Sequence, residues 1–295
     1  MTPTVNEWAI RQQICDIGKR IWQKSFCAGN EGNHSVKVAD NRYLCTPTGI
    51  SKGFLEPEDV IVCDAEGQQI EPNARGRKPT SEIKVHLAIY KVRSDVGAVI
   101  HSHPPHATAF AIAGIPLPEA VHPEAEVFLG KVRTAQFAMP STHDLPQSLL
   151  PLIGPETNSL LMGNHGSVSF STDIIDAYYK LEILDAYCRV LLLVHQLGRI
   201  NLLDQDQMKG LLEVKKRFGL EDERLACAEQ GCIGADNSEF LALFNERPAT
   251  AVASRNGGAC ECAAPAPNGS PYPMDEQRFE NMVQTITDQI MASAG

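Results

Sequence analysis

The stretch "GAVIHSHPPHATAF", residues 97–110, places two histidines two positions apart at the end of an apolar run, with a third histidine close behind. Successive side chains of a β-strand point to opposite faces, so we expect His101 and His103 on one face of a strand that ends at Pro104. Two neighbouring imidazoles suit a divalent metal ion. The alternative is a pair of half-buried histidines that hydrogen-bond to backbone carbonyls, and the spacing alone does not separate the two interpretations.

The composition is that of a folded chain with a sizeable core, because 43% of its 295 residues are hydrophobic and 21% are charged. A formal net charge of -10 argues against a nucleic-acid partner. The sequence shows neither an apolar run of the ~18 residues that a membrane span needs nor the apolar core of a signal peptide, so we expect a cytoplasmic protein without a membrane partner. The nine cysteines are an odd number, which favours reduced thiols.

Helical and strand-like hydrophobic patterns alternate on both sides of the histidine pair. Short β-prone runs separated by turn residues predict an antiparallel meander before it, and Thr80 or Ser81 would cap the helix that follows the meander. The expected elements are a helix over 6–24, the meander over 32–70, helices over 80–93 and 106–114, a tightly connected strand pair over 158–171, and a long helix over 172–198.

The C-terminal part of the chain changes in composition. Residues 247–273 are rich in Ala, Pro and Gly and cannot build a core, whereas residues 274–295 carry apolar side chains along one helical face. We therefore expect a catalytic domain over 1–246, a linker or arm over 247–273 and an amphipathic helix over 274–295. Four cysteines suit either a thiolate metal site or inert thiols: Cys227, Cys232, Cys260 and Cys262.

Two further residues complete a candidate metal centre. Catalytic zinc usually takes three protein ligands, and His165, in a turn between the paired strands, is the best third candidate; otherwise it is a turn histidine bonded to nearby backbone. Glu82 suits a general acid or base beside the metal, or a fourth ligand that substrate displaces. Its alternative role is that of an acidic residue capping a helix N-terminus.

Three short segments are rich in Gly, Asn, Thr and Ser: "GNHSVK" at 32–37, "TPTG" at 46–49 and "PTS" at 79–81. Backbone N–H groups and hydroxyls in such turns can surround a phosphate group. Ordinary turns use the same residues, so each segment alone is a weak signal.

Taken in order, "GNHSVK", "TPTG", "KPTSE…H", "HSHPPHATA" and "GNHG" resemble the motifs of the class II aldolase/adducin family, over roughly residues 8–200. That family includes L-fuculose-1-phosphate aldolases and L-ribulose-5-phosphate 4-epimerases. The resemblance implies an α/β fold of α/β/α layers, with a central, mainly antiparallel β-sheet flanked by helices. It also implies a homotetramer with active sites at subunit interfaces and one zinc ion per subunit.

The resemblance also assigns roles to residues of this sequence. His101, His103 and His165 would hold the zinc ion, and Glu82 would be the catalytic carboxylate. His106 would pack or act behind the ligands. The phosphate-binding residues would be Gly32, Asn33, Thr48, Gly49, Thr80 and Ser81. The histidines expected to be structural are His34, His86, His122, His143 and His195.

The reaction that the resemblance implies is cleavage of a ketose 1-phosphate of the L-fuculose-1-phosphate type. The products would be dihydroxyacetone phosphate and an aldehyde, formed through an enediolate that the metal stabilises. Other activities of the family on sugar phosphates stay open, namely those of a 4-epimerase, a decarboxylase or a dehydratase. A non-catalytic, adducin-like scaffold is the remote alternative, and the presence of all three metal histidines argues against it.

One position departs from the aldolase pattern. Aldolases of the family use a tyrosine, contributed by the neighbouring subunit, to transfer a proton at the oxygen of the departing aldehyde, whereas this sequence has Phe137 at that position, and phenylalanine has no proton to donate. Either Tyr272 substitutes for it or the substrate differs from a fuculose-type sugar. Glu124 and Glu126 offer acids that would serve an epimerase, decarboxylase or dehydratase.

Overall fold

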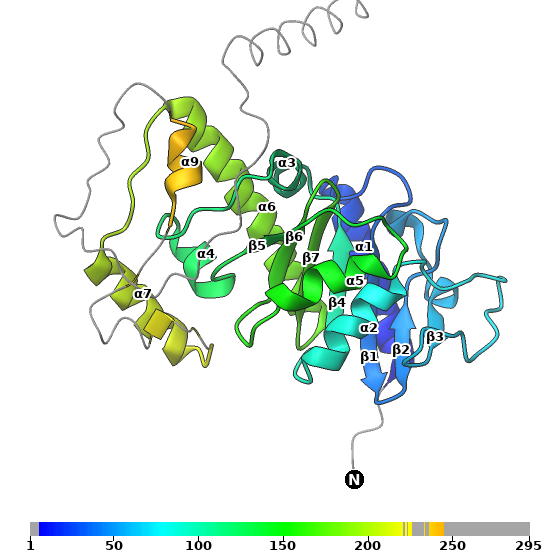
Figure 1. Ribbon diagram of the computed structural model, residues 1–295. Coiled ribbons are helices and arrows are strands. Elements are labelled where there is room, and N and C mark those ends of the chain that lie inside the picture. The colour runs from blue at the N-terminus through cyan, green and yellow to red at the C-terminus, as the bar shows by residue number, and fades with distance from the viewer. Residues whose placement is uncertain (1–5, 221, 223, 226–232, 234–235, 245–295) are drawn as a thin grey trace, which may run out of the picture. The chain divides into compact units, whose positions relative to one another are not determined.

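A seven-stranded mixed sheet forms the centre of the protein (Figure 1), with the strand order β3-β2-β1-β4-β7-β6-β5. Every neighbouring pair is antiparallel except β5 and β6, which are parallel, so the expected mainly antiparallel sheet is confirmed. The strands are β1 Asn33–Ala39, β2 Arg42–Cys45, β3 Ile61–Cys63, β4 Ala98–Ser102, β5 Arg133–Ala135, β6 Ser159–Met162 and β7 Gly166–Ser171. The computed structural model describes residues 6–220, 222, 224–225, 233 and 236–244.

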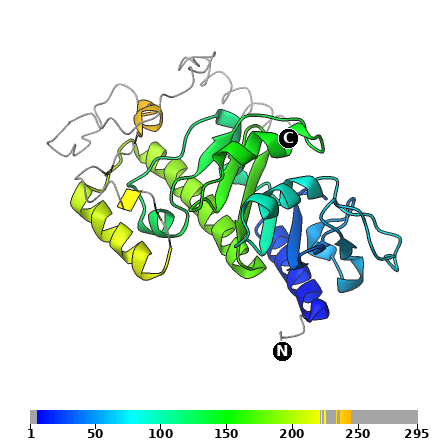
Figure 2. The same ribbon diagram turned by 60° about the horizontal axis from the view of Figure 1, so that its bottom comes forward.

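Helices cover both faces of this sheet, which confirms the expected α/β/α layers. In Figure 1, α2 and α5 lie in front of the sheet and α1 and α6 behind it, and Figure 2 shows the same layers from a second direction. The α-helices are α1 Glu7–Gln23, α2 Ile83–Val92, α3 Pro105–Ala113, α4 Pro123–Phe128, α5 Asp144–Leu149, α6 Ile174–Leu197, α7 Gln205–Arg217 and α9 Ser238–Ala242. The short 3-10 helices are η1 Lys52–Phe54, η2 Pro57–Asp59 and η3 Leu150–Leu152.

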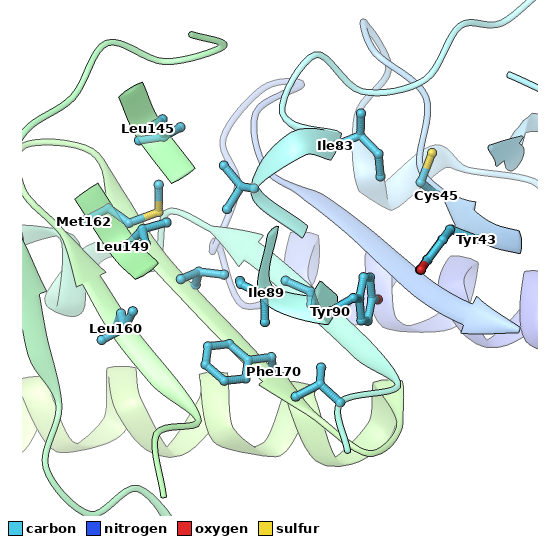
Figure 3. Packing of buried hydrophobic residues seen from close by; sticks show 14 of the residues in the cluster. Tyr43, Cys45, Ile83, Ile89, Tyr90, Leu145, Leu149, Leu160, Met162 and Phe170 are labelled. Atoms are coloured by element: carbon cyan, nitrogen blue, oxygen red, sulfur yellow. The ribbon is translucent and has the colours of Figure 1, made fainter. Parts of the chain in front are cut away.

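The alternation of side chains along the strands divides the core into two layers. In β4, Val99 packs with Ile89 and Phe170 on the side of α2 (Figure 3). Its neighbours Ala98 and Ile100 pack on the opposite side with α1 and α6. Because β4 is buried on both faces, it reads in the sequence as a continuous apolar run. The same alternation places His101 on the face of the sheet that Val99 shares.

The helix ends show ordinary capping chemistry. Asp173, one residue after the expected cap Thr172, accepts hydrogen bonds from the backbone of Ile175 and Asp176 and so begins α6. Gly198 ends that helix in the left-handed conformation that favours glycine. These caps set the two ends of the long helix.

Several sequence-based expectations fall outside the described residues. These are the linker at 247–273, the helix at 274–295, Tyr272 and the four cysteines named for a second metal site. The domain boundary at residue 246 therefore stays a prediction. Within the described part of the chain, every helix is too short or too polar to cross a membrane.

Candidate metal centre

Three imidazoles meet where β4 ends beside the turn that joins β6 to β7. His101 pairs with Val168 of β7, so the end of β4 lies beside the turn that carries His165. The ligand nitrogens of His101, His103 and His165 all lie within 4.8 Å of one another. A tetrahedral zinc ion, with Zn–N bonds of about 2.0–2.1 Å, sets its nitrogens about 3.3 Å apart. His103 Nε2 and His101 Nε2, 3.1 Å apart, fit that spacing.

The protonation of these rings also suits a metal ion. His101 Nδ1 donates to the backbone carbonyl of Ser167 at 2.8 Å, which leaves the Nε2 lone pair facing the other two rings. Burial lowers the pKa of His101 to about 3 and that of His103 to about 4, and it also lowers the pKa of His165. All three rings are therefore neutral at pH 7, the form in which imidazole binds metals.

The lowered pKa values predict that the metal-free protein loses stability in mild acid. In the unfolded chain a histidine takes up a proton near its ordinary pKa of about 6.5, whereas His34, His101 and His103 resist protonation in the folded chain down to about pH 3–4. Stability therefore falls as the pH drops below about 6.5. We expect the Tm of chelator-treated protein to fall by several degrees between pH 7.5 and 5.5. The exposed His143, changed to Gln, should leave that fall unchanged, and a Tm independent of pH would contradict the prediction.

Glu82 lies beside the imidazoles and does not cap its helix. It occupies the N-cap position of α2 without a side-chain capping bond, so the helix-capping interpretation is wrong. Its Oε2 accepts a hydrogen bond from Asn33 Nδ2 at 2.9 Å and lies 3.3 Å from His101 Nε2. Its Oε1 lies 3.8 Å from His165 Nε2. A carboxylate at this distance can exchange protons with a molecule bound at the three rings.

A chain of buried hydrogen bonds orients Glu82, and sequence reasoning missed one of its members. The amide of Asn33 donates to Glu82 and receives a hydrogen bond from His86 Nε2 at 2.5 Å, while His86 Nδ1 lies 2.7 Å from Ser35 Oγ. His86, expected to be only structural, thus positions Asn33. The sequence signal that could have identified His86 is its spacing of four residues from Glu82, which puts both residues on one helix face.

A cavity of about 220 Å³ adjoins the three histidines and Glu82. Ser141 and Lys52, which sequence reasoning did not single out, also line it, and Ser141 Oγ donates to Ser81 Oγ at 2.9 Å. The turn chemistry of this wall, with backbone N–H groups and hydroxyls, suits an anion. All six residues named as phosphate-binding line the same cavity: Gly32, Asn33, Thr48, Gly49, Thr80 and Ser81.

Gly32 is required both by its backbone and by its surroundings. Its φ of +75° is a left-handed conformation, and a Cβ at this position would lie 2.9 Å from the carbonyl oxygen of His101. We expect Gly32→Ala to lower the free energy of unfolding by about 2–4 kcal/mol, the sum of backbone strain and a forced shift beside the site. Gly114→Ala is the matched control, because Gly114 has φ +69° and open space around it. Equal losses for both variants in urea unfolding would show that the contact with His101 costs nothing.

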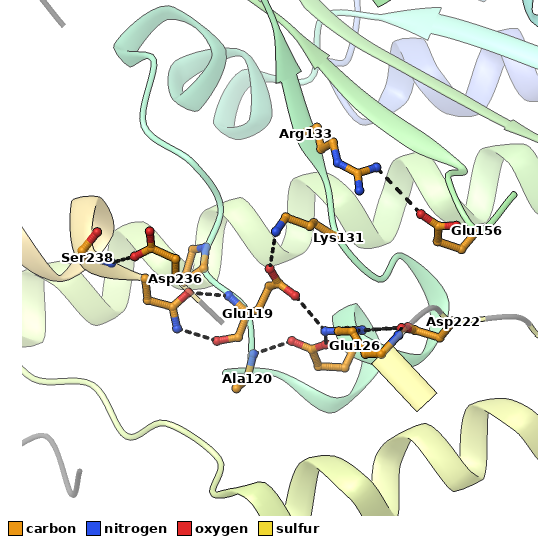
Figure 4. A network of polar contacts seen from close by, with 12 residues as sticks. Glu119, Ala120, Glu126, Lys131, Arg133, Glu156, Asp222, Asp236 and Ser238 are labelled. Carbon is orange, nitrogen blue, oxygen red and sulfur yellow. Dashed lines mark hydrogen bonds and ion pairs between the residues drawn. The ribbon is translucent and has the colours of Figure 1, made fainter. Parts of the chain in front are cut away.

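Two acids expected to serve an alternative reaction lie elsewhere. Glu126 is buried against Arg224 Nη1 at 2.7 Å and accepts from the backbone of Ala120 (Figure 4). Glu124 lies 3.3 Å from His122, and neither acid lines the cavity. The expectation that Glu126 serves as a reactive acid is therefore wrong, because its carboxylate is paired with the buried guanidinium of Arg224.

His106 and Phe137 also lie outside the cavity. His106 Nδ1 contacts Asp185 Oδ2 at 2.8 Å, which agrees with its exclusion from the ligand set. Phe137 is 55% exposed, and its backbone nitrogen packs beside Gly163, two residues before His165. Phe137 is therefore a surface residue whose backbone lies next to the turn that carries His165.

The three imidazoles and the carboxylate thus lie at the end of the central strand β4, next to a cavity lined by turns. The chain belongs to the class II aldolase and adducin family, since the model of the Class II Aldolase and Adducin N-terminal domain matches residues 12–192. The match agrees with the span expected from the motifs.

Individual relatives are also similar to this chain. It is 32% identical over 186 residues to an L-fuculose phosphate aldolase of Methanococcus maripaludis, covering 63% of this chain and 96% of the relative. It is 30% identical to a 5-methylthioribulose-1-phosphate/5-deoxyribulose-1-phosphate aldolase of Rhodospirillum rubrum, over 72% of this chain and 93% of the relative. A solved L-fuculose 1-phosphate aldolase superimposes with a TM-score of 0.63 at 27% identity, over 70% of this chain and 96% of that structure.

Proposed function

We propose that this protein is a zinc-dependent aldolase that cleaves a ketose 1-phosphate into dihydroxyacetone phosphate and an aldehyde. The observation that carries the proposal is the convergence of three imidazoles and Glu82 beside a cavity lined by turns rich in Gly, Asn, Thr and Ser. Two aldolases among the relatives, named for phosphorylated ketoses, support this reaction class. We further propose a cytoplasmic homotetramer with one zinc ion per subunit and active sites at the subunit interfaces.

Two sets of residues would bind the substrate and the metal ion. The turns at Gly32, Thr48 and Ser81 would bind the phosphate and so fix the carbon chain of the sugar relative to the histidines. A zinc ion held by His101, His103 and His165 would act as a Lewis acid on the substrate's carbonyl. In cleavage, the hydroxyl on the carbon that becomes the aldehyde loses its proton as the carbon–carbon bond breaks. The electron pair of that bond passes to the three-carbon fragment, which must then gain a proton at carbon.

Glu82 is the group that can deliver that proton. Its carboxyl lies within 3.8 Å of both His101 Nε2 and His165 Nε2, and Asn33 holds it in that position. His86 in turn fixes the amide of Asn33. The orientation of the proton-transfer group is thus set before substrate binds, which is the geometry that general acid–base catalysis needs.

Phe137 favours a second candidate reaction within the same family. At the proposed subunit interface, the exposed Phe137 would face the cavity of a neighbouring subunit, and its ring, unlike a tyrosine, cannot exchange a proton with the hydroxyl that becomes the aldehyde oxygen. Such a site suits a reaction that converts no hydroxyl into an aldehyde, such as decarboxylation or dehydration of a sugar phosphate. A ketose 1-phosphate whose aldehyde half is apolar is the other substrate class that the ring accommodates.

A product assay separates these reactions. Zinc-loaded protein is incubated with pentulose and hexulose 1-phosphates, a 5-deoxypentulose 1-phosphate among them, and with the unphosphorylated sugars as controls. We expect release of dihydroxyacetone phosphate from at least one phosphorylated ketose and from none of the controls. Release of carbon dioxide from an acidic sugar phosphate, or loss of water without cleavage, would replace the aldolase proposal with the second candidate.

A further inference from the structure

Lys52 is a buried cation in the wall of the cavity. It opens η1, directly after the turn that carries Thr48 and Gly49, and its side chain is among the largest that are fully buried, at 1% exposure. Its Nζ donates to the backbone carbonyls of Asn30 at 2.6 Å and Ile50 at 2.8 Å. These two hydrogen bonds use two of the three donors of an ammonium group.

The surroundings of Lys52 differ from those of the other buried lysines. Lys180 lies 3.6 Å from Asp176, and Lys215 lies 2.7 Å from Asp222, so each has a carboxylate partner. Lys52 forms no ion pair with a carboxylate in the part of the chain that the structure describes. A buried charge without a counter-ion is costly, so a structural tie between two loops does not by itself explain a lysine at this position.

The two carbonyls that Lys52 binds belong to the loops that form the anion-binding wall. Asn30 precedes Gly32 in one loop, and Ile50 follows Gly49 in the other. The ammonium group therefore links both loops, and Lys52 lines the same cavity as they do. An anion in that cavity would supply a counter-charge in direct contact with Lys52, which no carboxylate of the described residues provides.

We infer that Lys52 is a phosphate-binding residue that supplies the cationic counter-charge for the substrate's phosphate group and ties together the two loops that hold it. The inference rests on the proposed function. It adds a charged residue to a cavity wall whose other proposed phosphate-binding groups are backbone N–H groups and hydroxyls. A dianionic phosphate ester is accordingly the substrate class that this site selects over an uncharged sugar.

The charge of Lys52 is sensitive to pH. Burial lowers its pKa to about 8, against the nearby negative charges that raise it. Loss of the proton above that pH removes the counter-charge, so anion affinity should fall there. The titratable groups that interact with Lys52 are Cys27, Glu31 and Glu82, which raise its pKa, and His34 and His101, whose own pKa values it lowers.

The test uses inorganic anions and needs no turnover. Calorimetric titration at pH 7 compares phosphate affinity in zinc-loaded wild type, Lys52→Gln and Lys52→Met. Gln keeps a hydrogen-bond donor for the loop carbonyls but lacks the charge, and Met removes both. We expect at least a tenfold loss of phosphate affinity in both variants, with one zinc ion per chain retained. A solvent-exposed lysine of the same chain, changed by Lys24→Gln, should leave the affinity unchanged.

Sulfate gives a second readout. Sulfate keeps its charge across this pH range, so a change in its affinity reports a change in the protein. The wild-type measurement also does not depend on how well a variant folds. Wild-type affinity for sulfate should fall between about pH 7 and pH 9.5, whereas Lys52→Gln should show little change. Wild-type phosphate affinity in Lys52→Gln, or a sulfate affinity of the wild type that is constant with pH, would overturn the role of Lys52 alone. If the wild-type protein bound neither anion, the proposed phosphate-binding wall of the cavity, and with it the proposed function, would be contradicted.

Discussion

His103→Ala is expected to lose its bound zinc and all carbon–carbon bond cleavage while the chain stays folded. Removing one of three imidazoles leaves two ligands, too few for the usual catalytic zinc site. His103 is only partly buried and follows the last residue of β4, so its removal should cost the sheet little. Metal analysis, circular dichroism and release of dihydroxyacetone phosphate check the three parts of this prediction.

His106→Ala is the matched control for that variant. His106 belongs to the same segment but contacts Asp185 and lies outside the cavity. It should lower the Tm modestly and keep one zinc ion per chain. Full activity of a metal-free His103→Ala protein would refute the metal centre.

Glu82→Gln is expected to keep zinc and substrate binding but to lower kcat by about 10²- to 10⁴-fold, the usual contribution of a positioned general acid or base. Glutamine is nearly isosteric and can still accept the hydrogen bond from Asn33, so the site's shape is retained. Glutamine has no carboxyl proton to transfer. A kcat measured at saturating substrate, beside zinc content, separates this loss from a binding defect.

An exposed acid outside the cavity supplies the control for Glu82. Glu124→Gln removes a carboxylate from the start of α4 and should leave kcat unchanged. If Glu82→Gln turned over at the wild-type rate, Glu82 would have no part in proton transfer, and another group would have to supply the proton.

The layout of the fold could be predicted because its local signals agree with one another. The short β-prone runs of β1 to β3 with turn residues between them, the apolar run of β4 and the helical period of α1 and α6 each indicate the element that forms. Helix starts were less certain, as Asp173 rather than Thr172 caps α6. A one-residue error of this kind arises because both residues are good N-caps.

The site was predictable in so far as its residues lie in recognisable motifs. His101 and His103 share one strand end, and His165 follows from the tight turn between two strands. The position of Lys52 in the cavity wall was not predictable in this way, because its hydrogen bonds join two loops that meet only in the folded chain. The misassignment of Glu126 has the same origin, since its partner Arg224 lies 98 residues away.

The most direct test of the metal centre is anomalous diffraction at the zinc absorption edge from crystals of the zinc-loaded protein. We predict one strong peak per chain, bonded to nitrogens of His101, His103 and His165 at about 2.0–2.1 Å. A map in which those three rings face apart, or in which the only zinc peak lies elsewhere, would contradict the account.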